Sequence, residues 1–385
     1  MNPDVLTAVP TPDALPLPGP VWLFEFLLLL TFVLHLLAMN FLLGGAVISV
    51  VERLRAKAMP RHGVGSAVTA GAGEPFEIAR WFERKMPPAM AFTITLGIAP
   101  LLFVQSMYGH LLYTSSVITA WPWFSVLGVL LVTYSLVYRL SFNGENLSGA
   151  TKITGVLVMI GLLTIAFLYV NNMTLSIRPE SWAAKYFARP DGTSWNLDDP
   201  TFWPRLLHFV TAALAVAGMV LAVVGARRVN KGDESGRPWL KIGGLWFVIP
   251  TFLQFAWGLW WLLTLDREVM LPLMGGDLPN TLVFMLSIFL PIGALVMVAM
   301  SLKSERPFGM VHGASWLLLL TVVGMVITRH AVREYTLQPY YDVNTAQTLP
   351  QWGVFGIFAA LLVVAIAITA WMVAAIMRAP KAEVG

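Results

Sequence analysis

The sequence predicts an all-α polytopic membrane protein, folded as one bundle of about nine transmembrane helices. Hydrophobic residues make up 57% of the 385 positions, charged residues make up only 12%, and the mean hydropathy is +0.72. These values lie far outside the range of soluble globular domains. The apolar residues form continuous runs that can cross about 30 Å of hydrocarbon as helices, without the alternation that barrel strands require.

Nine apolar runs are long enough to span a membrane, and the gaps between them are short. The runs cover residues 21–51, 88–118, 121–142, 152–173, 203–226, 240–264, 281–302, 309–330 and 352–377. No gap is long enough to bury a core of its own. We therefore expect a transmembrane domain at 21–377, after an extracytoplasmic arm at 1–20 and before a cytoplasmic tail at 378–385.

The distribution of basic residues predicts the orientation of the bundle. With the N-terminus outside, the loops after the first, third, fifth and seventh runs and the C-terminal tail are cytoplasmic. Together with the adjoining ends of the runs, they contain 18 of the 25 Lys and Arg residues. This excess predicts a multi-pass protein of a bacterial-type cytoplasmic (inner) membrane, with its C-terminus in the cytoplasm. The formal net charge of +4 then reflects an imbalance at the lipid surface, and no nucleic-acid partner is needed to explain it.

Three segments outside the runs have an informative composition. Residues 1–20 contain no Lys or Arg, so they lack the basic region of a cleavable signal peptide. Within the cytoplasmic loop 52–87, the stretch 74–88 mixes large apolar side chains with charges, which predicts a helix lying in the membrane interface. The extracytoplasmic loop 174–202 is rich in tryptophan and forms either a packed lid over the helix ends or an aromatic belt.

The histidines are the main candidates for chemistry. The chain has no cysteine, which excludes disulfides, iron–sulfur clusters and covalent c-type haem. Four of the six histidines lie in apolar runs toward the predicted outer side, namely His35, His110, His208 and His330. Ionisable groups within a membrane cost several kcal/mol and usually have a function.

Each candidate also has a purely structural interpretation. Any of these histidines could be packed and hydrogen-bonded without binding a metal. His330 and Glu334 share a helix face, and Glu334 could simply pair with Arg329 and Arg333 in an interfacial ion network. The same two arginines could instead bind haem propionates, because a guanidinium matches a carboxylate.

Met285, His312 and His62 are three further residues whose side chains could bind iron. Met285 lies near the outer end of its run, where a thioether could share low-spin iron with a histidine. His312 lies at the cytoplasmic mouth of the eighth run and is expected to be structural or exposed. His62 lies in the basic loop and is expected to be solvated.

Several strings resemble subunit I of the cytochrome bd-type quinol oxidases, a nine-helix family with haems near the outer face. HLLAMNFLLGGAVISVVERL resembles the first-helix segment, which implies that His35 ligates a high-spin haem. FWPRLLHFVTAALAVAGMVLAVVGA is similar to the family's histidine segment, which implies that His208 ligates the low-spin haem b, with Met285 as the nearest methionine ligand. REYTLQPY resembles a string whose glutamate ligates a b haem, and Glu334 holds that position.

The chain also departs from this family. Leu337 stands where the glutamate string has an arginine, and His330 stands where the family has a tryptophan between two haems. The third run lacks the buried glutamates of the oxidases, and the outer loop after the sixth run is short. These departures argue against oxygen reduction and the usual quinol site. The extra histidines, His110 and His330, suggest a six-coordinate iron that transfers electrons.

We therefore expect a membrane haem b cytochrome that is a subunit of a respiratory oxidoreductase. It would hold two or three b haems, and their iron ligands would come from His35, His110, His208, Met285, His330 and Glu334. A quinol or a periplasmic cytochrome c would exchange electrons at the outer face, and a second membrane subunit is an expected partner. Two alternatives stay open: reduction of oxygen or nitric oxide at a haem near His35 and Glu334, and a proton- or ion-coupled transporter with a histidine relay.

Overall fold

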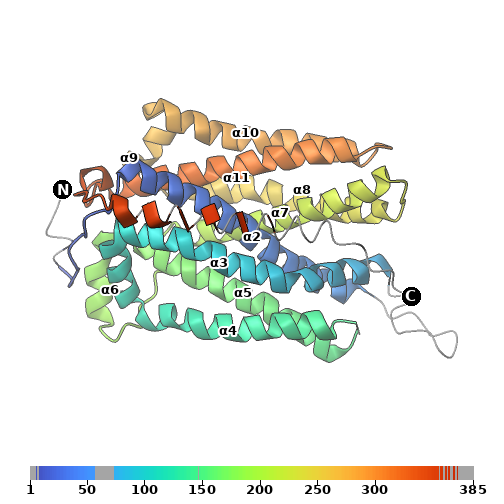
Figure 1. Ribbon diagram of the computed structural model, residues 1–385, viewed down its shortest axis with the longest axis horizontal. Helices are drawn as coiled ribbons and strands as arrows, with labels where there is room; N and C mark the ends of the chain where they lie inside the picture. Colours follow the sequence, from blue (N-terminus) through green and yellow to red (C-terminus); the bar gives the residue numbers. More distant parts are fainter. Residues whose placement is uncertain are drawn as a thin grey trace.

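The computed structural model shows an all-α bundle of long helices that lie side by side (Figure 1). It describes residues 6, 8–56, 73–145 and 147–354, and separate positions between 356 and 371. Eight helices within these residues are long and apolar enough to cross a membrane. They are α2 (Val21–Arg55), α3 (Gly73–Ile118), α4 (Ala120–Asn143), α5 (Gly149–Leu175), α7 (Phe202–Asn230), α8 (Gly236–Leu263), α10 (Leu278–Ser301) and α11 (Phe308–Leu337).

These helices confirm the first eight predicted spans. The ninth predicted span, 352–377, and the predicted tail, 378–385, lie largely outside the described residues. One expectation is wrong: the stretch 74–88 is not a separate interfacial helix but the beginning of α3, because its apolar side chains face the bundle. Phe76, Ile78 and Phe82 are all buried there.

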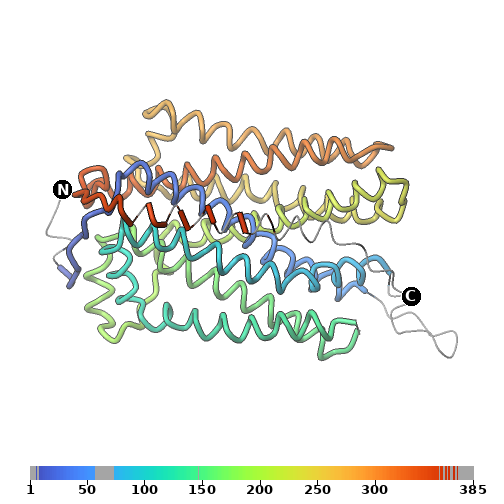
Figure 2. The backbone as a smooth tube through the Cα atoms, viewed as in Figure 1, coloured from blue at the N-terminus to red at the C-terminus, as the bar shows by residue number. Residues whose placement is uncertain are grey.

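Shorter elements gather at one end of the bundle. They are η1 (Pro179–Ser181), α6 (Trp182–Ala188), α9 (Arg267–Leu271), the π-helical η2 (Pro272–Gly276) and η3 (Val343–Thr345). The chain trace in Figure 2 begins α2 at this same end. We call it the outer end, after the predicted orientation, and call the opposite end, where α2 finishes at Arg55, the inner end.

Part of the tryptophan-rich loop packs as a lid over the outer ends of the helices. Trp182 is fully buried, and its Nε1 donates to the carbonyl of Leu175 at 2.9 Å. Trp195 and Trp203 stay partly exposed, as aromatic residues at a membrane interface do. Residues 8–20 of the N-terminal arm pack over the same end, where Leu17 is buried and pairs with Thr348 in a parallel bridge.

Small residues bring the central helices close together. A Cβ on Gly218 of α7 would lie 2.6 Å from the backbone nitrogen of Phe247 in α8, and one on Gly44 of α2 would lie 2.8 Å from the Cβ of Ala217 in α7. In a membrane, helices associate through such close packing, since lipid is as apolar as the helix surfaces. The glycines therefore fix α7 between α2 and α8, which determines where His208 lies.

Candidate functional site

The outer half of the bundle encloses a cavity of about 370 Å³. Its walls are mostly apolar and come from α3, α5, α7, α8, α10 and α11. Tyr108 lies in this wall at a kink of α3, where its φ of −130° and ψ of 29° leave the helical range. A concave, mostly apolar cavity with a few polar groups is the usual form of a cofactor site.

His208 is the only histidine of the described residues in the lining of this cavity. It lies less than two turns from the start of α7, and its ring packs on Gly258 of α8, where a Cβ would be 3.7 Å from its Nδ1 and Cε1. The ring lies beside the backbone of Gln254, but the Nδ1 finds no hydrogen-bond partner of good geometry. His208, the predicted ligand, therefore lies in the wall of the cavity with its Nδ1 unpartnered.

Three arginines line the same cavity: Arg205, Arg329 and Arg333. None of them forms an ion pair with a carboxylate of the described residues. The guanidinium of Arg329 lies 4.7 Å from the ring centre of Phe32, and that of Arg333 lies 5.1 Å from the ring centre of Tyr108. A buried cation is costly unless an anion compensates it, so this cavity is suited to an anionic ligand.

Buried polar atoms without partners concentrate in this region. Besides the Nδ1 of His208, they include the Nε of Arg329 and the indole nitrogen of Trp261, both residues of the cavity wall. Such atoms are uncommon in folded proteins, and a group of them indicates a bound molecule or water.

Met285 does not reach the cavity. Its neighbours Phe284, Ser287 and Ile288 line it, but Met285 lies on another face of α10 and packs in the cluster around Leu273. Two other thioethers face the space, those of Met173 in α5 and Met325 in α11. Met325 is one turn before Arg329 on the same helix face.

His35 lies outside this cavity, against α3. Its Nδ1 is 3.0 Å from the carbonyl oxygen of Thr93, and a Cβ on Gly97 would approach its Cε1 to 2.8 Å. This hydrogen bond makes Nδ1 the donor and leaves Nε2 as the free nitrogen. Phe32 stacks on the His35 ring with centroids 6.4 Å apart, and the guanidinium of Arg329 lies over the same Phe32 ring. Phe32 therefore connects His35 to Arg329 in the cavity wall.

His110 is buried and packs edge-on against Tyr341, with ring centroids 4.6 Å apart. It lines neither this cavity nor the smaller one beside Glu334. Its surroundings resemble those of a packed core histidine. His312 accepts a hydrogen bond from Trp316 at 3.2 Å near the inner end, as its structural interpretation expects, and His62 lies outside the described residues.

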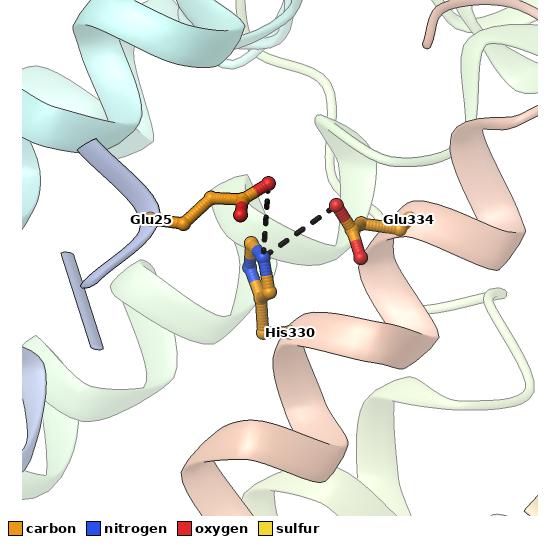
Figure 3. A group of neighbouring side chains, drawn as sticks. All are labelled: Glu25, His330 and Glu334. Atoms are coloured by element: carbon orange, nitrogen blue, oxygen red, sulfur yellow. Dashed lines mark ion pairs between the residues drawn. The ribbon is translucent and has the colours of Figure 1, made fainter. Parts of the chain in front are cut away.

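His330 and Glu334 meet a residue that sequence reasoning missed, Glu25 of α2. The Nε2 of His330 lies 3.6 Å from Glu334 and 4.0 Å from Glu25, and donor atoms of all three lie within 4.8 Å of one another (Figure 3). The signal for Glu25 was present, because a carboxylate stands early in an apolar run. Arg205 was missed as well, although it precedes His208 by three residues on the same helix.

The structure separates His35 from this group. Glu25 and His35 are ten residues apart on α2, which corresponds to about 15 Å along the helix axis. His35 and Glu334 therefore lie in different surroundings. The predictions of a haem near both residues and of a histidine relay stay predictions.

Hydrogen bonds to Asp277, which directly precedes α10, hold the outer ends of α10 and α11 together. Asp277 caps α10 and accepts from the Tyr335 hydroxyl at 2.7 Å and from the Asn280 side chain at 3.0 Å. These bonds, that from Tyr335 first, lower the pKa of Asp277. The carboxylate thus stays ionised and anchors the end of α11 that carries Arg333.

A scan against protein-family models and a search of curated proteins find no match to this chain. A search of solved structures finds a similar fold in the structure of bd oxidase from Geobacillus thermodenitrificans. The TM-score is 0.68 at 13% sequence identity, over 95% of this chain and 100% of that chain. The expected bd-like bundle is therefore confirmed at the level of the fold.

Proposed function

We propose that this protein binds haem b in the cavity between α7, α8, α10 and α11, and that it transfers electrons as a membrane subunit of a respiratory oxidoreductase. The observation that carries the proposal is the meeting of His208 with Arg205, Arg329 and Arg333 around one apolar cavity. Histidine is the usual axial ligand of haem b. The two propionates of haem b match the need for anions among three arginines that lack carboxylate partners.

The residues have separable roles in this proposal. His208 would ligate the iron, and its contact with Gly258 keeps the ring close to α8. The arginines would bind the propionates through charge-assisted hydrogen bonds. Met325 and Met173 are better placed than Met285 to provide a second ligand, because both line the cavity. Haem b, when bound, supplies a one-electron centre whose potential depends on its ligands and its burial.

The other predicted iron ligands stay predictions. His35 has a free Nε2 and a fixed tautomer, which suits a ligand of a second haem, whereas the packing of His110 against Tyr341 offers no comparable space. A quinol or a periplasmic cytochrome c would exchange electrons at the outer end. A second membrane subunit could cover part of the exposed apolar surface, such as that at Phe124 and Leu131 of α4.

The experiment is a comparison of two histidine variants by reduced-minus-oxidised spectra and pyridine haemochrome assay. His208→Ala removes the proposed ligand, and His312→Ala makes the same change at the inner end. We expect His208→Ala to lose one haem per chain, with no change in His312→Ala. Equal haem content in the two variants would contradict the proposal.

Carbon monoxide tests the alternative of terminal chemistry at a haem near His35. Added to the reduced protein, it shifts the Soret band if an iron has an open position. We expect no shift for the cavity haem, because His208 and a methionine of the cavity wall would leave its iron no open position. A shift that disappears in His35→Ala but not in His208→Ala would support reduction of oxygen or nitric oxide at His35.

A further inference from the structure

The group of Glu25, His330 and Glu334 is a second polar site of the outer end, apart from the main cavity. Glu25 comes from the first turns of α2, and the other two residues are one turn apart on α11. Figure 3 shows both carboxylates turned toward the same edge of the imidazole. None of the three residues lines the main cavity.

Neither carboxylate forms an ion pair with a lysine or arginine of the described residues. Their ion pairs within the described residues are both with His330, whose charge depends on protonation. The nearby arginines, Arg329 over the Phe32 ring and Arg333 over the Tyr108 ring, line the main cavity and form no ion pair with either carboxylate. Two carboxylates this close repel each other at low dielectric, so a cation or a shared proton must lie between them.

The donor set is typical of a small transition-metal ion. One imidazole nitrogen and two carboxylate oxygens suit Zn²⁺, Mn²⁺ or Fe²⁺. Bonds of about 2.0 Å in tetrahedral Zn²⁺ sites put neighbouring ligand atoms about 3.3 Å apart. The observed 3.6 and 4.0 Å are close to this spacing. A haem iron offers only two axial positions, whereas three donors converge here.

A second cavity gives this group access and room for water ligands. It has a volume of about 190 Å³ and lies beside Glu334, with Gln338, Asp342 and Asn344 also in its wall. These residues belong to the segment that follows α11 at the outer end. A hydrated cation could reach the carboxylates by this route, and water could complete the coordination.

We propose that Glu25, His330 and Glu334 bind one divalent transition-metal cation that is not part of a haem. The site joins α2 to α11 beside the wall of the haem cavity. This gives His330 and Glu334 a role different from the haem-iron ligation that the sequence predicted. The proposal does not depend on the cavity haem, since no residue is shared between the two sites.

The test measures Zn²⁺ binding to the purified full-length chain after treatment with a chelator. Equilibrium dialysis against ZnCl₂, followed by elemental analysis, gives the zinc bound per chain. We expect one Zn²⁺ in the wild type and at least a tenfold weaker affinity in Glu25→Gln, His330→Gln and Glu334→Gln. Glu268→Gln, an exposed acid of α9, and His312→Gln are matched controls and should bind as the wild type does.

Mn²⁺ provides a second measurement that does not depend on how well a variant folds. Its six-line aqueous EPR signal should fall on addition of wild-type protein and return when Zn²⁺ displaces it. Elution in size-exclusion chromatography shows whether each variant is folded, and a haemochrome assay of the same samples reports the cavity haem separately.

Three outcomes would overturn the metal site. The wild type could bind no zinc or manganese, or the variants could bind zinc as tightly as the wild type. Alternatively, the three variants could lose a haem while the wild type binds no zinc, which would return His330 and Glu334 to haem ligation. Absence of haem from all samples with zinc binding intact would instead contradict only the proposed function.

Discussion

The inner end of the bundle and the wall of the main cavity differ in how buried charge is compensated. At the inner end, Glu83 is fully buried and accepts hydrogen bonds from Arg53, Arg80 and Ser49, while Glu145 pairs with Arg80 and Arg84. Around the main cavity, Arg205, Arg329 and Arg333 form no ion pair with a carboxylate of the described residues. Charges that are paired within the chain hold helices together, and buried charges without an ion pair indicate a ligand.

The largest expected effect is at the inner end, in Glu83→Ala. This change leaves Arg53 and Arg80 buried without their shared carboxylate, and breaking such a pair costs about 3–5 kcal/mol. Thermal unfolding in detergent measures the loss. Glu77→Ala, on the exposed side of the same helix, is the control and should change the unfolding temperature little. Equal stability of the two variants would show that the inner network is not structural.

Arg329→Met tests the outer end with the opposite expectation. It removes an uncompensated cation, so the haem-free protein should not lose stability. Haem binding should weaken by about 10- to 100-fold, because a hydrogen bond to a charged group contributes about 1.5–3 kcal/mol. Haem titration of the haem-free protein measures this, with exposed Arg306→Met of the inner end as the control. Destabilisation without weaker haem binding would mean that Arg329 is structural too.

Two glycines compare the His35 and His208 environments within the outer half. Gly97→Ala puts a Cβ 2.8 Å from His35, whereas Gly258→Ala makes ordinary contact at 3.7 Å with His208. We expect Gly97→Ala to destabilise the protein by about 1–3 kcal/mol through overpacking and Gly258→Ala to be near neutral. The unfolding temperatures and visible spectra of the two variants test this expectation. A larger loss of stability in Gly258→Ala than in Gly97→Ala would mean that the helices pack less tightly around His35 than around His208.

The smallest effect is the pH dependence of the inner network. Hydrogen bonds from Arg84 and Arg80 lower the pKa of Glu145 below its usual value of 4.5. The contribution of ionised Glu145 to the free energy of unfolding is therefore complete above pH 4.5. It is lost as the pH falls through the lower pKa of the folded state. Since Glu145 is half-exposed, the contribution is below about 1 kcal/mol. The stability of Glu145→Gln should converge with that of the wild type toward pH 3, and a constant difference would exclude this linkage.

The fold was predictable from sequence because continuous apolar runs and the distribution of basic residues report directly on helices in a membrane. The eight described spans follow the predicted runs closely. The start of α3 was mistaken because its mixture of charged and apolar side chains looked interfacial, although its charges pair with other buried charges at the inner end. Composition cannot reveal such pairing.

The site was predictable only in its residue types. His208, Arg329 and Arg333 were expected, and they line one cavity. Met285 was expected there but lies on another face of α10, because one residue turns a helix by about 100° and the rotation depends on packing. Glu25 lies beside His330 and Glu334 because α2 contacts α11. No local sequence pattern predicts this contact between helices.

The most direct test of the account is the visible spectrum of the purified wild-type protein, expressed with ample haem. If His208 and the arginines of the cavity wall form a haem site, the reduced protein shows the α-band of haem b, and the pyridine haemochrome assay gives at least one haem per chain. A folded, colourless protein would contradict the proposal that these arginines bind haem propionates.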